Sequence, residues 1–304
     1  MKEQNWQNQL RKRLRFCWGT VFSFGIVGFI VMYFCMIELA GGIDSLIENG
    51  AAFPFVEGWF YIPFIAYFVG YAVVIFIFSG TIRRTREEIQ HTFLADSCYE
   101  IFEKIDFSPE KGLNKDVLES SSLIRMGKHY YSNDLIKAKY KGIPFEISNV
   151  SMKEEHKNNV MIEDIVMIFQ GQWFVFKLDH NPIEYLQVSD VEFMGSIMVP
   201  NRWKKIELEN SMFNQLFHVH SSDKKEVEKI LTAPAMEKVL EIKSQLGGEL
   251  LLGIMRNELH LAINSKRNLF EFQEWIKKGV PYQNELISRL RLLVSIIDEL
   301  DLAK

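Results

Sequence analysis

Charge is missing from two long stretches near the N-terminus of this 304-residue chain. Phe16–Ile37 runs for 22 residues and Trp59–Ile82 for 24 residues without Asp, Glu, Lys, Arg or His. At about 1.5 Å rise per residue, helices of these lengths span about 33–36 Å, enough to cross a hydrocarbon core of about 30 Å. The sequence therefore predicts a transmembrane hairpin within residues 1–86, with spans of about 16–37 and 59–82.

The lack of ionisable groups inside the two stretches also excludes some functions. Proton and ion paths through membranes are marked by charged or titratable side chains, and two helices cannot enclose a pore, so one chain alone is not expected to transport. A cleaved signal peptide has an apolar core of only about 7–15 residues. Glu38 also stands where such a peptide needs a small residue. A buried hairpin in a soluble core is the remaining alternative.

Basic residues are absent from the connecting stretch, Glu38–Gly58, which contains four acidic residues. Basic residues flank both apolar stretches on their other sides, and such flanks stay in the cytoplasm. We therefore expect a multi-pass protein of the bacterial inner membrane with both termini in the cytoplasm. The flanking residues are Arg11, Lys12, Arg13 and Arg15 before the first stretch and Arg83, Arg84 and Arg86 after the second.

Small residues occur in both apolar stretches, where they allow two helix backbones to approach closely. Gly25 and Gly28 lie in the first stretch, and Ala66 and Gly70 lie in the second. We expect them to pack the hairpin against itself; contact between several copies of the chain is the alternative.

Cysteine is scarce, and the sequence motifs of common enzymes are missing. The three cysteines have no metal-ligand spacing, and a reducing compartment favours no disulfide. The net charge of −4 gives no basic footprint for nucleic acid. The chain has no P-loop, dinucleotide fingerprint, nucleophile elbow or kinase motif. These absences indicate no cofactor, and they favour a binding protein over an enzyme.

The rest of the chain has the patterning of a water-soluble α+β domain. We expect a helical stalk or linker over residues 87–130, with helices at Glu87–Ile105 and Lys115–Gly127. An α+β domain with a mostly antiparallel sheet and flanking helices follows over 131–280, and a C-terminal helix over 281–304. The predicted strands are Asp134–Tyr140, Ile143–Val150, Met161–Phe169, Gln172–Asp179, Val191–Val199, Leu250–Met255 and Glu258–Ile263.

Turns and later helices complete this pattern. Gln170-Gly171 is predicted to be the turn of a hairpin, and Arg256-Asn257 the turn of another. Lys224–Leu246 is predicted as one helix ended by Gly247-Gly248. Glu285–Leu300 has a leucine and isoleucine stripe that predicts docking against the domain or against the stalk helix, rather than a free coiled coil.

Several short segments resemble an uncharacterised bacterial family with two N-terminal transmembrane helices, whose members are often found beside LemA-like membrane proteins. The resemblance extends over roughly residues 10 to 272. It implies the topology and a LemA-like partner, but no chemistry. The segments that carry it are Tyr131-Ser132-Asn133-Asp134-Leu135-Ile136, Tyr140-Lys141-Gly142-Ile143-Pro144-Phe145-Glu146-Ile147-Ser148, Phe169-Gln170-Gly171, Phe213-Asn214-Gln215-Leu216-Phe217-His218-Val219-His220-Ser221-Ser222-Asp223 and Ile230-Leu231-Thr232-Ala233-Pro234-Ala235-Met236.

The pair His218 and His220 is the sharpest candidate site. Alternate residues of a strand face the same side, so both imidazoles can approach one metal ion. Asp223 or His260 would be a third ligand. The alternative is a pair of surface histidines. Asp223 also stands three residues before Glu226, as in the capping box that begins a helix.

A small basic cluster around Trp203 is a candidate for contact with anionic lipid headgroups. It consists of Arg202, Lys204 and Lys205, and a solvated turn is the alternative.

These observations predict an inner-membrane protein whose cytoplasmic domain binds a protein partner or a small ligand as a scaffold or adaptor. A homo-oligomeric membrane assembly is one alternative. A membrane-anchored, metal-dependent enzyme that uses His218 and His220 is another.

Overall fold

The computed structural model describes residues 2–39, 62–99, 101–157, 163–180, 182–193, 197–267 and 280–302. The chain forms two compact units, Met1–Thr92 and Phe93–Lys304, which we describe separately.

The first unit contains helix α1 (Lys2–Leu39) and most of helix α3 (Ile62–Cys98). Arg15–Glu38 and Ile62–Thr81 each have a mean hydropathy of 2.2 and are long enough to cross a membrane. Only 11% of the first segment and none of the second is buried within the protein. An apolar helix that is exposed all round fits a lipid environment better than water. Two candidate membrane helices are therefore present, while residues 40–61 lie outside those that the structure describes.

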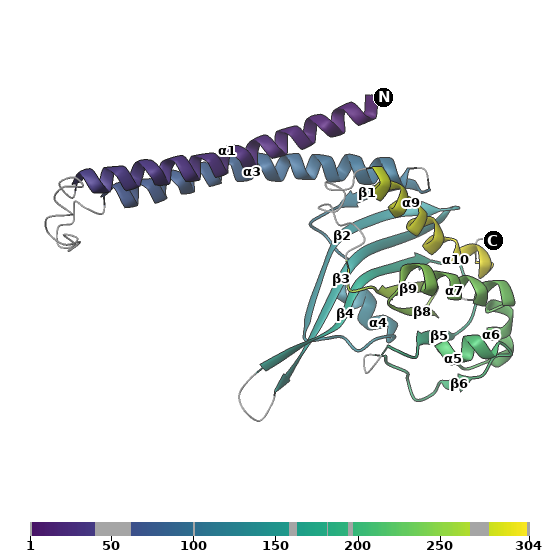
Figure 1. Cartoon of the computed structure of the whole chain (residues 1–304). Helices are drawn as coiled ribbons and strands as arrows, with labels where there is room; N and C mark the ends of the chain where they lie inside the picture. Colours follow the sequence, from purple (N-terminus) through teal and green to yellow (C-terminus); the bar gives the residue numbers. More distant parts are fainter. Residues whose placement is uncertain are drawn as a thin grey trace. The chain divides into compact units, whose positions relative to one another are not determined.

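The second unit is built on a nine-stranded sheet in the order β1-β2-β3-β4-β9-β8-β5-β7-β6, and all neighbouring strands run antiparallel. This arrangement, with helices beside the sheet, confirms the predicted α+β class (Figure 1). The strands are β1 (Glu103–Ser108), β2 (His129–Tyr140), β3 (Ile143–Lys157), β4 (Glu163–Lys177), β5 (Tyr185–Asp190), β6 (Lys204–Ile206), β7 (Phe217–Ser221), β8 (Glu249–Met255) and β9 (Glu258–Asn264).

Both faces of the sheet are covered. On one face, helix α4 (Lys115–Ser121) and the loop after it pack Leu118 and Leu123 into a cluster with Trp173. Figure 1 shows α7, α9 and α10 along the opposite face. Tyr140 and Lys141, at the end of β2, bind the carboxylate of Asp298 in α10. The remaining helices are α5 (Ser211–Leu216), α6 (Lys224–Ile230), α7 (Ala233–Leu246), α9 (Val280–Val294) and α10 (Ile296–Glu299).

The predicted turn at Gln170-Gly171 is wrong, because β4 passes straight through it. Gly171 pairs with Val150 of β3, and a Cβ atom there would lie 1.8 Å from the carbonyl oxygen of Ile263. Glycine is present here because two backbones approach each other closely, and not because the chain turns.

Other boundaries also differ from the predictions. The strand predicted at Val191–Val199 is wrong: Tyr185–Asp190 forms β5, whose residues are all buried between β8 and β7. The helix predicted to reach Ile105 ends at Cys98 and is followed by β1. The predicted helix Lys115–Gly127 ends at Ser121, because Ser122 takes a left-handed conformation with φ 54°.

Two predicted helices are each divided in two. Thr232 interrupts Lys224–Leu246: its hydroxyl accepts from the backbone N–H of Ala235 and starts α7, with Pro234 in the first turn. Ser295 separates α9 from α10.

The hairpin of β8 and β9 is confirmed, with Arg256 and Asn257 at positive φ in its turn. The end of α7 at Gly247 and the docking of the C-terminal stripe are confirmed as well. The buried stripe residues are Leu286, Leu290, Leu293, Ile297 and Leu300.

We predict that Gly171→Ala destabilises the sheet strongly. The new methyl group cannot fit beside the Ile263 carbonyl, so β4 and β9 must separate locally, which we expect to cost about 3 kcal/mol of unfolding free energy. Thermal unfolding of the full chain in detergent measures this. Gly80→Ala is the control, because a Cβ there meets nothing within 4 Å. Equal melting temperatures for both variants would contradict the close approach.

Candidate functional site

The long hairpin of β3 and β4 extends beyond the neighbouring strand β9 (Figure 1). β4 pairs with β9 only from Gln172 onward, whereas its pairing with β3 continues as far as Glu163. We call residues 151–157 of β3 and 163–169 of β4 the arm. The first residues of β2, from His129, pair with the arm along β3.

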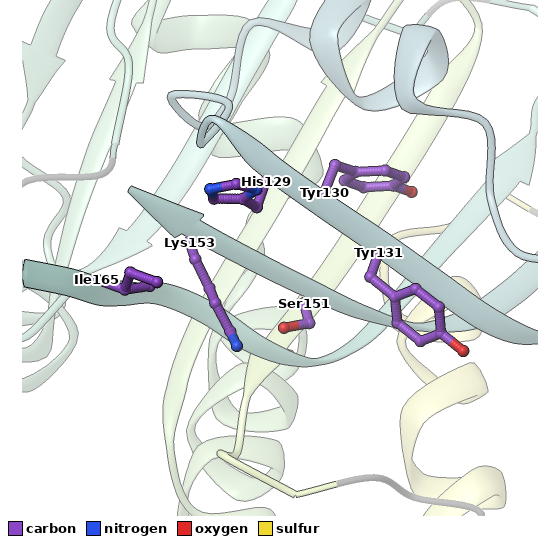
Figure 2. Close-up of a pocket in the computed structure, with 6 residues that line it drawn as sticks. All are labelled: His129, Tyr130, Tyr131, Ser151, Lys153 and Ile165. Carbon is purple, nitrogen blue, oxygen red and sulfur yellow. The ribbon is translucent and has the colours of Figure 1, made fainter. Parts of the chain in front are cut away.

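A hollow of about 370 Å³ lies on the arm. In the strand register, His129 lies opposite Lys153, and Tyr131 lies opposite Ser151. Side chains from three strands therefore meet around the hollow, as Figure 2 shows. The residues that line it are His129, Tyr130, Tyr131, Ser151, Lys153 and Ile165.

Some charged side chains around the hollow form ion pairs, and Lys153 forms none with the residues that the structure describes. Glu155 accepts hydrogen bonds from Lys128 and from Nε2 of His129. The bond from Lys128, and then the bond from His129, lowers the pKa of the Glu155 carboxyl. Among the side chains that the structure describes, no carboxylate lies within 4.0 Å of the Lys153 ammonium. Lys153 is therefore the cation at this hollow that is available to a bound anionic group.

Large apolar side chains on the arm and at the start of β2 are exposed. Tyr131 is 65% exposed and Ile165 is 60% exposed, and Val166 and Met167 next to it are also exposed. Apolar groups clustered on a protein surface mark sites of interaction more often than apolar groups scattered singly. The hollow therefore combines an apolar surface, three hydroxyl groups and the Lys153 ammonium, groups that can contact a bound molecule.

A second hollow, of about 500 Å³, lies between α5 and α7. Its lining residue Lys243 pairs with the buried carboxylate of Asp190 and lies 3.6 Å from Glu192. Because Lys243 neutralises a buried charge, its ammonium already has a structural role. The lining residues are Met212, Leu216, Leu240, Glu241, Lys243 and Ser244.

His218 and His220 lie on the same face of β7, as the strand prediction required. Their ring centroids are 6.4 Å apart, and the Nδ1 atom of each ring is buried without a hydrogen-bond partner among the described residues. Burial lowers the pKa of His220, and the nearby His218 and Lys205 lower it further. Both rings are half-buried, and their strand neighbours are Ser189 and Gln187 of β5.

The proposed third metal ligands lie elsewhere. Asp223 caps helix α6 and accepts from the backbone N–H groups of Lys225 (2.8 Å) and Glu226 (3.4 Å), which confirms its capping role. His260 bonds to Trp173 and Glu258. Within the described part of the chain, no three His, Cys, Asp or Glu side chains are grouped to hold a metal ion. The metal site at His218 and His220 stays a prediction with two ligands.

The basic cluster near Trp203 has local partners. The Arg202 guanidinium lies 4.2 Å from the centre of the Trp203 ring and 3.8 Å from Glu184. Lys205 lies 3.2 Å from Glu207, whereas Lys204 is exposed. Trp203 itself is buried and stacks on Tyr185. Contact of this cluster with lipid stays a prediction.

Tyrosine rings, rather than small residues, face the glycines of α1. A Cβ on Gly28 would lie 2.9 Å from the Tyr67 ring, and one on Gly25 would lie 3.1 Å from the Tyr71 hydroxyl. The Tyr67 hydroxyl donates to the Gly25 carbonyl at 2.9 Å. On α3, Ala66 is exposed and Gly70 has open space beside it. Gly25 and Gly28 thus make room for two aromatic side chains within the hairpin.

The basic flanks are exposed where their side chains are described. These side chains are Lys12, Arg13, Arg15, Arg83 and Arg84. The side chains of Arg11 and Arg86 lie outside the described part.

Sequence reasoning missed a buried polar chain between β4 and β9. The Trp173 indole N–H donates to Nδ1 of His260 (3.1 Å), so Nε2 of this buried ring carries the proton toward Glu258 (3.1 Å). Lys177 completes the chain by pairing with Glu258. The partners on β4 are more than 80 residues away in sequence from those on β9, so no local pattern indicates the chain. All the polar atoms of His260 have partners, which is typical of a structural role.

A second polar network was also missed. Asp134 is buried, has φ 58°, and accepts from the side-chain amides of Asn133 (2.8 Å) and Asn149 (2.9 Å). Asn133 and Asp134 belong to the first segment that carries the family resemblance. Their role is to hold the irregular register between β2 and β3.

The polar chain predicts a loss of stability in mild acid. Burial lowers the pKa of His260 below its usual 6.5, while burial raises the pKa of Glu258 but bonds from His260 and Lys177 lower it to about 2. Below pH 6.5 this histidine is protonated in the unfolded chain but stays neutral in the folded chain until the pH falls to its lower folded-state pKa. The free energy of unfolding should therefore fall, by up to about 1.4 kcal/mol per pH unit for one such group.

Denaturant unfolding at pH 7.5 and 5.5 measures this loss. His260→Gln should be less stable at pH 7.5 but lose less stability on acidification than the unaltered chain. His220→Gln is the matched control, because the pKa of His220 is also lowered but its ring is only half-buried. An unchanged pH dependence in His260→Gln would show that this ring does not control the loss.

Comparison with known proteins adds a family match over part of the chain but no activity. Among curated proteins, none matches this chain. A solved structure, the mycobacterial trehalose monomycolate transport factor A, is similar over 67% of this chain and 95% of its own, with 9% identity and a TM-score of 0.37. The association with LemA-like proteins and the resemblance before residue 167 stay predictions. Residues 167–302 match the family described as "Protein of unknown function (DUF3137)", which confirms the predicted resemblance to a family of unknown function.

Proposed function

We propose that this protein is an integral inner-membrane adaptor: α1 and α3 anchor it, and its cytoplasmic domain holds a protein partner on the arm. The observation that carries this proposal is the exposed apolar surface of Tyr131, Ile165 and Met167 beside the hollow. A domain that lacked a partner would gain solubility from polar residues at these positions.

The anchoring is supported by the exposed apolar segments of α1 and α3. The basic residues lie before the apolar segment of α1 and after that of α3, away from the stretch that connects the two helices. Because such flanks stay in the cytoplasm, both termini lie on that side, together with the domain that follows α3. The protein is thus multi-pass, and its short connecting stretch faces outward.

The chemistry of the hollow indicates the kind of partner segment that fits. Tyr131 and Ile165 provide apolar contact, Ser151 provides a hydroxyl, and Lys153 provides a cation. An apolar segment that carries a carboxylate matches all three. A LemA-like membrane protein is the partner that the family resemblance suggests.

The topology predicts which positions react from outside the cell. In a chain whose Cys17 and Cys35 are replaced by alanine, a membrane-impermeant maleimide should label Ala51→Cys in intact spheroplasts. Lys12→Cys and Arg84→Cys should be labelled only after the membrane is opened. Labelling of Arg84→Cys in intact spheroplasts would refute the cytoplasmic placement of the domain.

The partner surface predicts a specific crosslink. A photoreactive amino acid at Tyr131 should crosslink the LemA-like protein in native membranes, identified by mass spectrometry. Lys153→Glu should reduce the yield at least severalfold, because the reversed charge repels the partner carboxylate. The matched control places the photoreactive residue at Met212, which is similarly exposed but lies on α5. Recovery of only the chain itself from position 131 would count against this partner.

A further inference from the structure

One side of β4 is left without a partner strand along the arm. From Glu163 to Phe169 this strand pairs with β3, and the described residues include no strand on its other side. The unpaired side begins beyond Gln170, whose N–H donates to the Asn264 side chain and whose carbonyl accepts from the Lys266 N–H. A row of backbone N–H and C=O groups is therefore available to another strand.

The residues of this edge favour strand pairing. The sequence from Glu163 to Phe169 contains neither proline nor lysine, the two residues that most often block an edge. Ile165, Val166 and Met167 are all exposed. The irregularity in the pairing with β3 falls at Ile168, so the register from Met167 to Glu163 is regular. An apolar, regular, unpaired edge is the form of surface that an additional β-strand recognises.

We propose that this edge pairs with the same edge of a second copy of the chain. The two β4 strands run antiparallel about a two-fold axis at Val166, and the two arms join into one continuous sheet. The contact uses the backbone edge of β4 and does not rest on the adaptor function.

The sequence of the edge is complementary to itself in this register. Val166 faces Val166 of the second copy, and Ile165 faces Met167. The acidic residues Glu163 and Asp164 face Phe169 and Ile168, so no like charges are opposed. A two-fold contact of this kind requires one surface to match itself, and this edge does.

The neighbouring strand β3 agrees with the same register. Lys153 pairs with Met167, and Glu155 pairs with Ile165. Each row across the joined sheet therefore has a lysine at one end, two apolar residues in the middle and a glutamate at the other end. The four central side chains, two from each copy, form one apolar patch.

The expected affinity is low in dilute solution, because about seven residues of strand bury less surface than a stable dimer needs. Anchoring both copies in one membrane raises their effective concentration and favours the contact. The full chain in its membrane is therefore the material to test.

Disulfide trapping at Val166 tests the two-fold axis. With Cys17 and Cys35 replaced by alanine, only Cys98 remains, and it is fully buried with its pKa raised to about 12. Oxidation should convert Val166→Cys to a covalent dimer at least fivefold more than Met198→Cys, a control of equal exposure in a loop outside the arm (46% and 45%). Equal dimer yields at the two positions would overturn the proposal.

Charge exchange tests the register. In the double variant Ile165→Lys/Met167→Lys, each new lysine faces a lysine of the second copy. In the double variant Ile165→Glu/Met167→Glu, each new glutamate faces a glutamate. Added to Val166→Cys, each should reduce trapping to the level of the Met198→Cys control. Coexpression of the lysine form and the glutamate form, with different tags, should restore a mixed dimer. Undiminished trapping in the lysine form alone, or no mixed dimer on coexpression, would overturn the proposed pairing.

Discussion

The pairing of Gln172–Lys177 with Glu258–Ile263 joins the two halves of the sheet. Strands β1 to β4 lie on one side of this seam, and β5 to β9 lie on the other. Three local features depend on it: the close approach at Gly171, the bond between Trp173 and His260, and the ion pair between Lys177 and Glu258. The seam is thus stabilised by close backbone contact, by the buried imidazole of His260 and by an ion pair.

The same seam decides where the candidate site lies. Because β9 stops near Gly171 while β4 continues to Glu163, the arm has one face that carries the hollow and one edge with no strand partner among the described residues. The exposed side chains of the arm contrast with the fully buried Trp173 and Phe174 of the same strand, which lie within the seam. The continuous strand β4 thus connects the buried core to the exposed arm.

The elements that sequence predicts best are those with local causes. The apolar stretches, the turn at Arg256-Asn257 and the cap at Asp223 depend on neighbouring residues, and the structure has them where the sequence places them. The errors arise where a distant contact overrides a local pattern. Gly171 has the local pattern of a turn residue, but the Ile263 backbone lies beside it in the fold. Strand β5 is buried between β8 and β7 although it contains the polar residues Gln187 and Ser189, which no local pattern predicts.

The candidate site shows the same division. His218 and His220 share a face because a strand alternates, which the sequence shows, but only the fold reveals that Asp223 is committed to a helix cap and His260 to Trp173. The hollow gathers His129, Ser151 and Ile165 through the register of three strands, and no spacing in the chain encodes that meeting. The sequence by itself determined the two apolar helices, the flanking charge and the α+β class, because these follow from the composition of short segments. Tertiary structure alone decided the seam, the arm and its unpaired edge, because pairing between strands far apart in the chain depends on packing across the whole sheet.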